Sequence, residues 1–330
     1  MRCVSLNTST ASCNAMTTNA VRVVTLANDS YAMPLAVCVR SLIDNHGAGR
    51  PLQITIIDGG LSEASKTRLH ASWQQSTADV SWEFVVPRFG DADESLPVWG
   101  RVPKLTYARL ALPDYLAEKS GRVVVLDSDT LVLTNLAPLH DVELDDAIAG
   151  ATRDPYIPVV SSIDGLATWR EAGLAADTPY FNAGVMVIDV GSWVRNQVTE
   201  RTLDYIRTTG GRLRQYDQDS LNAVVGQRWK ELDARWQAHP RTFHSLGRAP
   251  HLEPWVVHFS GRLKPWLYHA DGPSDRRFYD YLDRTEWKGI RAPRTVGAVA
   301  LRLYDSPLRR MVYPLETRLL ALKRRLDKGR

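Results

Sequence analysis

The segment from Arg122 to Leu133, with the sequence RVVVLDSDTLVL, constrains the fold of this chain more than any other. Its four consecutive apolar residues, Val123 to Leu126, are typical of a strand buried on both faces, as in a parallel sheet covered by helices. The apolar run ends abruptly at Asp127 and Asp129. Ligands of open α/β sheets bind just beyond the carboxyl ends of such strands. Two carboxylates at this place can converge on one hard divalent cation, Mg²⁺ or Mn²⁺, which is usually shared with substrate phosphates.

Asp-x-Asp is a short pattern, and on its own it is more often a solvated turn than a metal site. Its position after a buried strand favours a site, because charge there needs a partner. Phosphatases of the haloacid-dehalogenase type also carry Asp-x-Asp after an apolar strand. Their pattern has Thr or Val two residues beyond the second Asp, whereas this chain has Leu131 there and Thr130 one place early. A metal-dependent phosphatase therefore stays as a minor alternative.

Charge is unevenly distributed along the 330 residues. Lys and Arg total 41 and Asp and Glu total 37, yet residues 291–330 contain eleven of the basic residues and only three acids. Apolar residues recur between these basic residues, and such an amphipathic basic tail is typical of binding to an anionic membrane surface. An ordinary solvated helix packed on the domain is the alternative. No recognition motif supports nucleic-acid binding.

Cysteine usage and hydropathy indicate the compartment. The chain has three cysteines with no metal-ligand spacing, and their odd number does not suggest a disulfide framework. No apolar run is long enough to span a bilayer, and the first fifteen residues lack the apolar core of a secretory signal. These features predict a cytoplasmic protein, with peripheral attachment at the inner face of the membrane as the expected contribution of the tail.

The same patterns predict three parts: a disordered leader over residues 1–19, a catalytic domain over 20–290, and the basic amphipathic tail over 291–330. Met16 is an alternative start of the protein. An apolar content of 44% is enough to build a sizeable core.

Hydrophobic periodicity predicts alternating strands and helices in the first part of the chain. Strands are expected at 21–27, 52–57 and 80–86, and helices at 34–45 and 62–73, the second capped by Ser62. This order favours a parallel, right-handed, doubly wound sheet. Further along, the patterns predict a loop over the site at 87–104, helices at 105–116, 193–207 and 215–225, a short element within 135–146, and strands at 147–151, 179–190 and 255–259. Asn182, Ala183 and Gly184 are expected to form a turn.

Six short segments in fixed order resemble the family 8 glycosyltransferases, the retaining group that contains bacterial lipopolysaccharide galactosyl- and glucosyltransferases and glycogenin. The segments are ANDSY at 27–31, LTYAR at 105–109, LDSD at 126–129, FNAG at 181–184, YDQD at 216–219 and HFSGRLKPW at 258–266. Each is weak alone, but all six in order are a specific signal that covers residues 21–266. The resemblance implies a Rossmann-like nucleotide-diphospho-sugar transferase fold of the GT-A type, with a mainly parallel central sheet and helices on both faces.

The resemblance also implies a metal site. Asp127, Asp129 and His258 are the expected ligands of Mn²⁺ or Mg²⁺ on the diphosphate of a UDP-sugar, and an imidazole ligand favours Mn²⁺. Lys264 is expected to contact the diphosphate, and Gly261 to let backbone N–H groups approach it. Without the family context, a lone His on a strand is more often a core residue, and a single Lys is more often solvated.

The remaining roles concern the donor and the reaction. The resemblance implies donor contacts by Ala27, Asn28, Ser30, Tyr31, Arg109, Ser128, Asn182, Ala183, Gly184, Gly261 and Lys264. The family often has Asp where this chain has Asn28, but Asn can still pair with uracil. A helix-surface ion pair is the alternative for Arg109.

Asp217 and Gln218 are expected beside the transferred hexose. A helix N-cap is the alternative for Asp217, and either Asp217 or Asp219 could have that role. Asp154 is a weaker sugar-binding candidate. Gln218 is an amide and a poor nucleophile, which favours attack by the acceptor on the same face from which UDP departs, with the leaving phosphate oxygen taking the proton. A double displacement through Asp217 is the less favoured version.

The prediction is therefore a metal-dependent, retaining hexosyltransferase. The expected donor is UDP-galactose or UDP-glucose, and the expected acceptor is a glycan or glycolipid. A sugar-nucleotide-binding protein without transfer activity is the alternative from another class.

Overall fold

The computed structural model describes residues 19–74, 79–87, 96, 105–240, 243, 252–261, 264–268 and 272–293. A seven-stranded sheet, in the order β3-β2-β1-β4-β7-β6-β8, forms its centre, and β5 and β9 form a second, two-stranded sheet. The strands are β1 Val21–Ala27, β2 Leu52–Asp58, β3 Val80–Val85, β4 Arg122–Asp127, β5 Thr130–Val132, β6 Ala149–Arg153, β7 Phe181–Asp189, β8 Trp229–Glu231 and β9 Val256–His258.

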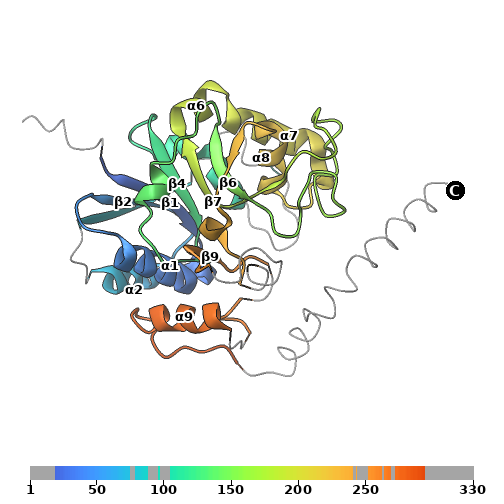
Figure 1. The fold of residues 1–330 in the computed structure, drawn as a ribbon. Coiled ribbons are helices and arrows are strands. Elements are labelled where there is room, and N and C mark those ends of the chain that lie inside the picture. The colour runs from blue at the N-terminus through green and yellow to red at the C-terminus, as the bar shows by residue number, and fades with distance from the viewer. Residues whose placement is uncertain are drawn as a thin grey trace, which may run out of the picture.

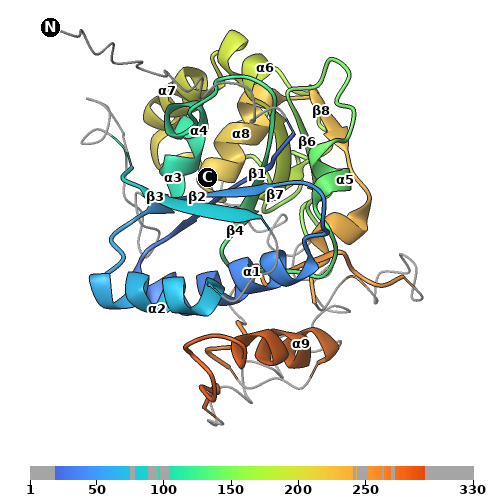
Figure 2. The ribbon, with the colours of Figure 1, turned by 90° about the vertical axis from the view of Figure 1, so that its left-hand side faces the viewer.

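Helices cover both faces of the central sheet (Figures 1 and 2). On one face lie α1 and α2, with α9 packed beyond α1, and on the other lie α3, α4, α6, α7 and α8. The α-helices are α1 Ala32–Asn45, α2 Glu63–Trp73, α3 Leu105–Ala108, α4 Leu112–Tyr115, α5 Ala137–His140, α6 Val190–Arg195, α7 Val198–Thr209, α8 Asp217–Val225 and α9 Pro273–Leu282. The described residues also form short 3₁₀ helices, which are η1 Asp29–Tyr31, η3 Arg109–Ala111, η4 Gly210–Arg212 and η5 Ala234–Gln237.

Most neighbouring strands of the central sheet run parallel. The pairs β1–β2, β2–β3, β1–β4 and β6–β8 are parallel, whereas β4–β7 and β6–β7 are antiparallel. The predicted mainly parallel sheet with helices on both faces is therefore confirmed. The antiparallel β7 has a consequence for the site: because it runs against β4, its first residues lie beside the end of β4.

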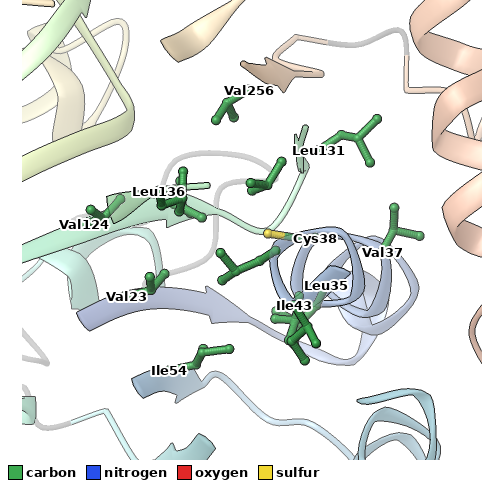
Figure 3. Packing of buried hydrophobic residues seen from close by; sticks show 14 of the residues in the cluster. Val23, Leu35, Val37, Cys38, Ile43, Ile54, Val124, Leu131, Leu136 and Val256 are labelled. Carbon is green, nitrogen blue, oxygen red and sulfur yellow. The ribbon is translucent and has the colours of Figure 1, made fainter. Parts of the chain in front are cut away.

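The core confirms the periodicity of the first part of the chain. Val23, Ile54 and Val124 from three neighbouring strands belong to the same buried cluster as Leu35 and Ile43 of α1 (Figure 3). All five side chains are almost completely buried. Truncation of one such buried aliphatic side chain to Ala typically costs about 2–5 kcal/mol. This packing holds the ends of β1 and β4 at one edge of the sheet, where the polar residues gather.

Several predicted elements are confirmed within a residue or two. Ser62 caps α2, and its Oγ accepts a hydrogen bond from the backbone N–H of Ser65 at 3.2 Å. Two predicted helices are interrupted. Residues 105–116 form α3, η3 and α4, and Pro113 stands in the first turn of α4, where its missing N–H costs nothing. Residues 193–207 are divided between α6 and α7, because Gln197 adopts a positive φ of 50°.

The predicted turn at Asn182, Ala183 and Gly184 is wrong, because these residues are buried members of β7. Asn222 of α8 explains why the strand begins so early. Its side chain accepts a hydrogen bond from the backbone N–H of Phe181 and donates one to the carbonyl of the same residue, each at 2.9 Å. A side-chain amide thus takes the place of a neighbouring strand for Phe181.

Three predicted segments lie almost wholly outside the described residues: the leader, the loop at 87–104 and the basic tail. Of these, the structure describes only residues 19, 87, 96 and 291–293. Among the described helices none combines the length and the hydropathy that crossing a bilayer requires.

Candidate active site

Three potential metal ligands converge at the end of β4. Asp127 is the last residue of β4, Asp129 lies in the turn that follows, and His258 is the last residue of β9. The antiparallel pairing of β5 with β9 places Thr130 opposite His258 and thereby fixes the imidazole beside the turn. The His258 Nε2 atom lies 3.2 Å from Asp129 Oδ1 and 3.5 Å from Asp127 Oδ2.

The donor atoms of these three residues lie within 4.8 Å of one another. Two carboxylates and one imidazole suit Mn²⁺, and the carboxylate oxygens also suit Mg²⁺. The two carboxylates stand one residue apart at the end of β4, and the imidazole faces them rather than solvent. The residues therefore fit a divalent cation.

Two buried cations flank the acidic turn. Lys264 forms an ion pair with Asp129 and donates a hydrogen bond to the carbonyl of Phe259 at 2.6 Å. Burial opposes the ionisation of Asp129, but the charge of Lys264 and the hydrogen bond from His258 outweigh it and hold the pKa of Asp129 well below its usual range. Burial likewise favours neutral Lys264, yet Asp129 outweighs that effect and raises the pKa of Lys264. A carboxylate and an ammonium group are thus both charged in a site that excludes most water.

Arg109 joins two carboxylates from distant parts of the chain. Its Nη2 atom lies 2.7 Å from Asp127 Oδ1, and its Nε atom lies 2.9 Å from Asp217 Oδ2, a charge contact without hydrogen-bond alignment. Its Nη1 atom donates to the carbonyl of Ala183 at 3.1 Å. The predicted alternative was an ion pair on a helix surface. It is wrong because Arg109 forms its ion pairs in a buried place, where only 8% of the residue is exposed.

Asp217 is the first residue of α8, and Tyr216 rather than Asp217 occupies the N-cap position. The alternative of Asp217 as an N-cap is therefore wrong. Asp219 has the anchoring role instead, because its buried carboxylate accepts hydrogen bonds from the backbone N–H groups of Arg214 and Gln215 at 2.6 and 3.0 Å. Burial raises the pKa of Asp217 from 3.8 to about 6; Arg109 opposes this rise and Asp127 adds to it.

This shift predicts how Asp217 affects stability with pH. Because its folded pKa lies above the unfolded value, Asp217 favours the folded state below pH 3.8 and loses that contribution as pH rises through about 6. Two pKa units correspond to about 3 kcal/mol. The free energy of unfolding of Asp217→Asn minus that of the wild type should therefore rise by about 3 kcal/mol between pH 4 and 7 and stay constant above. Urea denaturation of the metal-free proteins measures this difference, and a flat profile would contradict the assignment.

The side chain of Gln218 is held in one orientation by two groups. The backbone N–H of Ala183 donates to Gln218 Oε1 at 3.0 Å, and Gln218 Nε2 donates to Asp154 Oδ2 at 3.2 Å. The same Asp154 oxygen accepts from Asn182 Nδ2 at 2.7 Å. Asp154, which the sequence suggested only as a weak sugar contact, thus orients two of the predicted site residues. Its other oxygen accepts from the backbone N–H groups of Tyr156 and Ile157 at 2.8 and 3.0 Å.

The end of β1 carries the predicted nucleotide contacts. Ala27 is buried, and Ser30 donates a hydrogen bond to Asn28 Oδ1 at 2.7 Å. Tyr31 meets Trp266 edge to face, with ring centroids 6.1 Å apart, so the first and last of the six segments are in contact. The predicted donor residues therefore border the metal-binding turn on the β1 side.

The smaller predicted residues have definite places as well. Ser128 is buried between the two acids of the turn. Gly261 adopts a φ of 82°, a conformation that favours glycine, and lies between His258 and Lys264 in sequence. The structure thus brings together the predicted metal, diphosphate and sugar residues. One member of the site, Gln237, carries no signal in the sequence, and it contacts His258.

Gly184 leaves the space in which the imidazole of His258 lies. A Cβ atom on Gly184 would meet His258 Cε1 at 2.1 Å and Nδ1 at 2.5 Å. Gly184→Ala should therefore displace the ring, weaken Mn²⁺ binding by about 10- to 100-fold and cost about 1–3 kcal/mol of stability. Calorimetric titration with Mn²⁺ measures the affinity. Gly191→Ala is the matched control, because its Cβ would meet the flexible end of Arg195 at 3.1 Å and Asp189 Oδ1 at 3.5 Å, an ordinary contact distance. Equal affinities in the two variants would contradict this interpretation.

Comparisons with known proteins agree with this geometry. The family described as "Glycosyl transferase family 8" matches residues 22–270. General stress protein A of Bacillus subtilis (strain 168) is 29% identical over 291 residues, which cover 83% of this chain and 96% of that protein. Lipopolysaccharide glucosyltransferase WaaO of Escherichia coli (strain K12) is 26% identical over 215 residues, which cover 60% of each protein.

A solved structure shares the fold. The crystal structure of the galactosyltransferase LgtC in complex with donor and acceptor sugar analogs matches with a TM-score of 0.68 and 25% identity, over 81% of this chain and 96% of LgtC. The mostly parallel sheet with helices on both faces is the GT-A architecture of such enzymes. With the family match extending over most of the chain, this protein belongs to glycosyltransferase family 8.

Proposed function

We propose that this protein transfers galactose or glucose from a UDP-sugar to a glycan or glycolipid acceptor, with retention of the anomeric configuration and with Mn²⁺ or Mg²⁺ as cofactor. One observation carries the proposal. Asp127, Asp129 and His258 converge at the sheet edge, with the cations Lys264 and Arg109 beside them. A diphosphate leaving group needs this combination of a metal site and fixed positive charge.

The bound cation supplies Lewis-acid stabilisation of the charge that develops on the departing diphosphate. Lys264 contributes a fixed ammonium group that is already buried and therefore needs no reorganisation. Arg109 pairs with both Asp127 and Asp217 and so adds a second fixed positive charge beside the metal ligands. Together these residues would offset the negative charge of the leaving group beside largely buried side chains.

The sugar side of the site favours attack on the face from which UDP departs. Gln218 is uncharged, and its amide is held by Ala183 and Asp154, so it orients the sugar rather than forming a covalent intermediate. Asp217 is engaged by Arg109, which makes it a poor nucleophile. The bond from the anomeric carbon to the phosphate oxygen breaks, the acceptor oxygen bonds to the same face, and its proton passes to the leaving phosphate oxygen. The product therefore has the same configuration at the anomeric carbon as the donor.

The relatives support the chemical classes in this proposal. WaaO is named as a lipopolysaccharide glucosyltransferase, and the LgtC complex contains donor and acceptor sugar analogs. The proposed setting is the cytoplasm, and the basic tail at 291–330 is proposed to attach the enzyme to an anionic membrane surface where a lipid-linked acceptor would be presented. Nucleic acid is not a proposed partner.

Donor turnover tests the proposal. The protein would be incubated with Mn²⁺ and each of UDP-glucose, UDP-galactose, UDP-N-acetylglucosamine and GDP-mannose, and release of the nucleoside diphosphate would be followed. Slow, metal-dependent release of UDP from one hexose donor is the expected result. No release from any donor, together with no donor binding in calorimetry, would contradict it. Donor binding without release, even with glycan and glycolipid acceptors present, would favour a sugar-nucleotide-binding protein, and hydrolysis of a generic phosphomonoester would favour a phosphatase.

A further inference from the structure

Gln237 lies against the proposed metal ligand His258 and is held there by the backbone. It is the last residue of η5, and the next residue, Ala238, pairs with β9. The backbone N–H of Ala238 donates to Val256 at 2.8 Å, and that of His258 donates to Ala238 at 3.0 Å. Both side chains are buried, with Gln237 7% and His258 4% exposed. Both side chains are therefore enclosed by protein rather than by solvent.

The orientation of the Gln237 amide follows from a second neighbour. The backbone N–H of Val185 lies 2.9 Å from Gln237 Oε1. A backbone N–H can only donate, so the oxygen of the amide must face Val185. The amide nitrogen Nε2 then faces His258 Nδ1, at 3.3 Å. Because an amide nitrogen is only a donor, Nδ1 must accept this hydrogen bond.

This hydrogen bond determines the tautomer of His258. A neutral imidazole whose Nδ1 accepts carries its proton on Nε2. That proton points at the carboxylates, since Nε2 lies 3.2 Å from Asp129 Oδ1 and 3.5 Å from Asp127 Oδ2. The metal-free site is thus self-consistent, with every group in this chain of hydrogen bonds either donating or accepting.

Metal binding requires the opposite tautomer. The Nε2 atom can bind a cation only through its lone pair, so the ring proton must move to Nδ1. There it would meet the N–H groups of Gln237, a contact of donor with donor. Histidine ligands in most metal sites instead donate their other N–H to a carboxylate, a carbonyl or water, which strengthens them as ligands. In this chain Gln237 presents a hydrogen-bond donor to His258, where most metal sites present an acceptor.

We propose that Gln237 is a positioning residue that holds His258 in the Nε2–H tautomer and thereby weakens the binding of the divalent cation by Asp127, Asp129 and His258. This proposal rests on the proposed function, because it concerns the same metal site. Its consequence is that the chain by itself holds the ion loosely, although it has three suitable ligands. The matched substitution is Gln237→Glu, which keeps the shape and the bond from Val185 but offers His258 an acceptor.

The tautomer can be measured without any metal. Nitrogen-15 NMR of histidine-labelled protein distinguishes a protonated ring nitrogen from an unprotonated one, and His258→Ala identifies the signal among the eight histidines. The metal-free wild type should show a protonated Nε2 in the neutral ring, and Gln237→Glu should show a protonated Nδ1. A protonated Nδ1 in the wild type would overturn the proposal.

The effect on affinity is measured by titration with Mn²⁺ alone, followed by calorimetry or by the electron paramagnetic resonance of the free ion. Gln237→Glu should bind Mn²⁺ about 10- to 100-fold more tightly than the wild type. The added negative charge could also attract the ion directly, so the double variant Gln237→Glu/His258→Ala is compared with His258→Ala. Without His258, the substitution Gln237→Glu should no longer increase the affinity for Mn²⁺.

The outcomes separate this proposal from the proposed function. Equal or weaker Mn²⁺ binding by a folded Gln237→Glu protein, or a gain that persists without His258, would overturn the role of Gln237 while leaving the metal site intact. If neither the wild type nor Gln237→Glu binds Mn²⁺, the metal site itself is overturned and this proposal with it. Gln237→Met provides a further check, since it removes the donor without adding charge; circular dichroism shows whether it folds, and a folded protein should bind Mn²⁺ more tightly than the wild type.

Discussion

Asp129→Asn is expected to lower the rate of Mn²⁺-dependent UDP release by about a thousandfold. A metal ion acting as a Lewis acid supplies several kcal/mol of transition-state stabilisation, and each 1.36 kcal/mol is about tenfold in rate. Asp129 offers one carboxylate oxygen toward His258 and the other toward Lys264. An amide in its place removes the negative charge from both contacts, so the ion should bind weakly and Lys264 should lose its partner.

The substitution keeps the shape of the side chain, and circular dichroism shows whether the variant is folded before its rate is compared. Asn has nearly the same shape as Asp, and the backbone carbonyl of Asp129 still accepts the hydrogen bond from Phe259 at 3.0 Å. Asp114→Asn is the matched control, because that carboxylate is 50% exposed and pairs with the exposed Lys119, at 3.5 Å. The control should release UDP at the wild-type rate. A rate for Asp129→Asn within threefold of the wild type would rule out the assigned role of this carboxylate.

Arg109→Met is expected to have the largest effect on stability, a loss of about 3–5 kcal/mol in the free energy of unfolding. Removing one partner of a buried ion pair leaves the other charge uncompensated, which is the reason for a loss of this size. Here two carboxylates are affected, because Arg109 lies 2.7 Å from Asp127 and 2.9 Å from Asp217. Met retains most of the volume of the side chain, so the loss reports charge rather than a cavity.

Urea denaturation at several pH values measures this effect. The loss should be smaller at pH 5 than at pH 8, because Asp217, whose pKa is already raised to about 6, can become neutral at the lower pH. Arg212→Met is the control, since it removes an ion pair of the same length, 2.7 Å to Glu171, between side chains that are 52% and 57% exposed. Exposed pairs of this kind contribute little to stability, because solvent screens them. Similar losses in the two variants would show that Arg109 does not balance buried charge.

The two predictions concern different properties of one charge network. Asp127, Asp129 and Asp217 bring negative charge to the end of the sheet, and Arg109 and Lys264 offset it. Natural sites tolerate such a costly arrangement where it prepares a site for charged ligands. Arg109→Met tests how these charges balance one another within the protein, and Asp129→Asn tests whether they serve the release of UDP.

The sequence predicted the first half of the fold closely. Strands β1 to β3 and helices α1 and α2 begin within two residues of their expected positions. Their signals are local, because the burial of one face of a helix or of both faces of a strand imposes a short repeat on the chain. The same holds for Asp127 and Asp129, since an apolar run that ends in acids marks the carboxyl end of a buried strand.

Other parts of the site came only from the family resemblance. Nothing in the spacing of residues pointed to His258 or Lys264, which lie far from Asp129 in sequence. The short helices in 105–116 and the strand character of 182–184 were missed, because Pro113 and the side chain of Asn222 act through their particular surroundings rather than through a repeat.

By itself, then, the sequence determined the alternation of strands and helices, the buried strand β4 and the acidic turn that follows it. Only the tertiary structure decided that β7 runs antiparallel beside β4, that Arg109 joins Asp127 to Asp217, and that Gln237 presents a donor to His258. The physical reason is the range of the interactions. Periodicity reports which face of an element is buried, but it does not report which distant strand or side chain covers that face, and the polarity of a hydrogen bond depends on that partner.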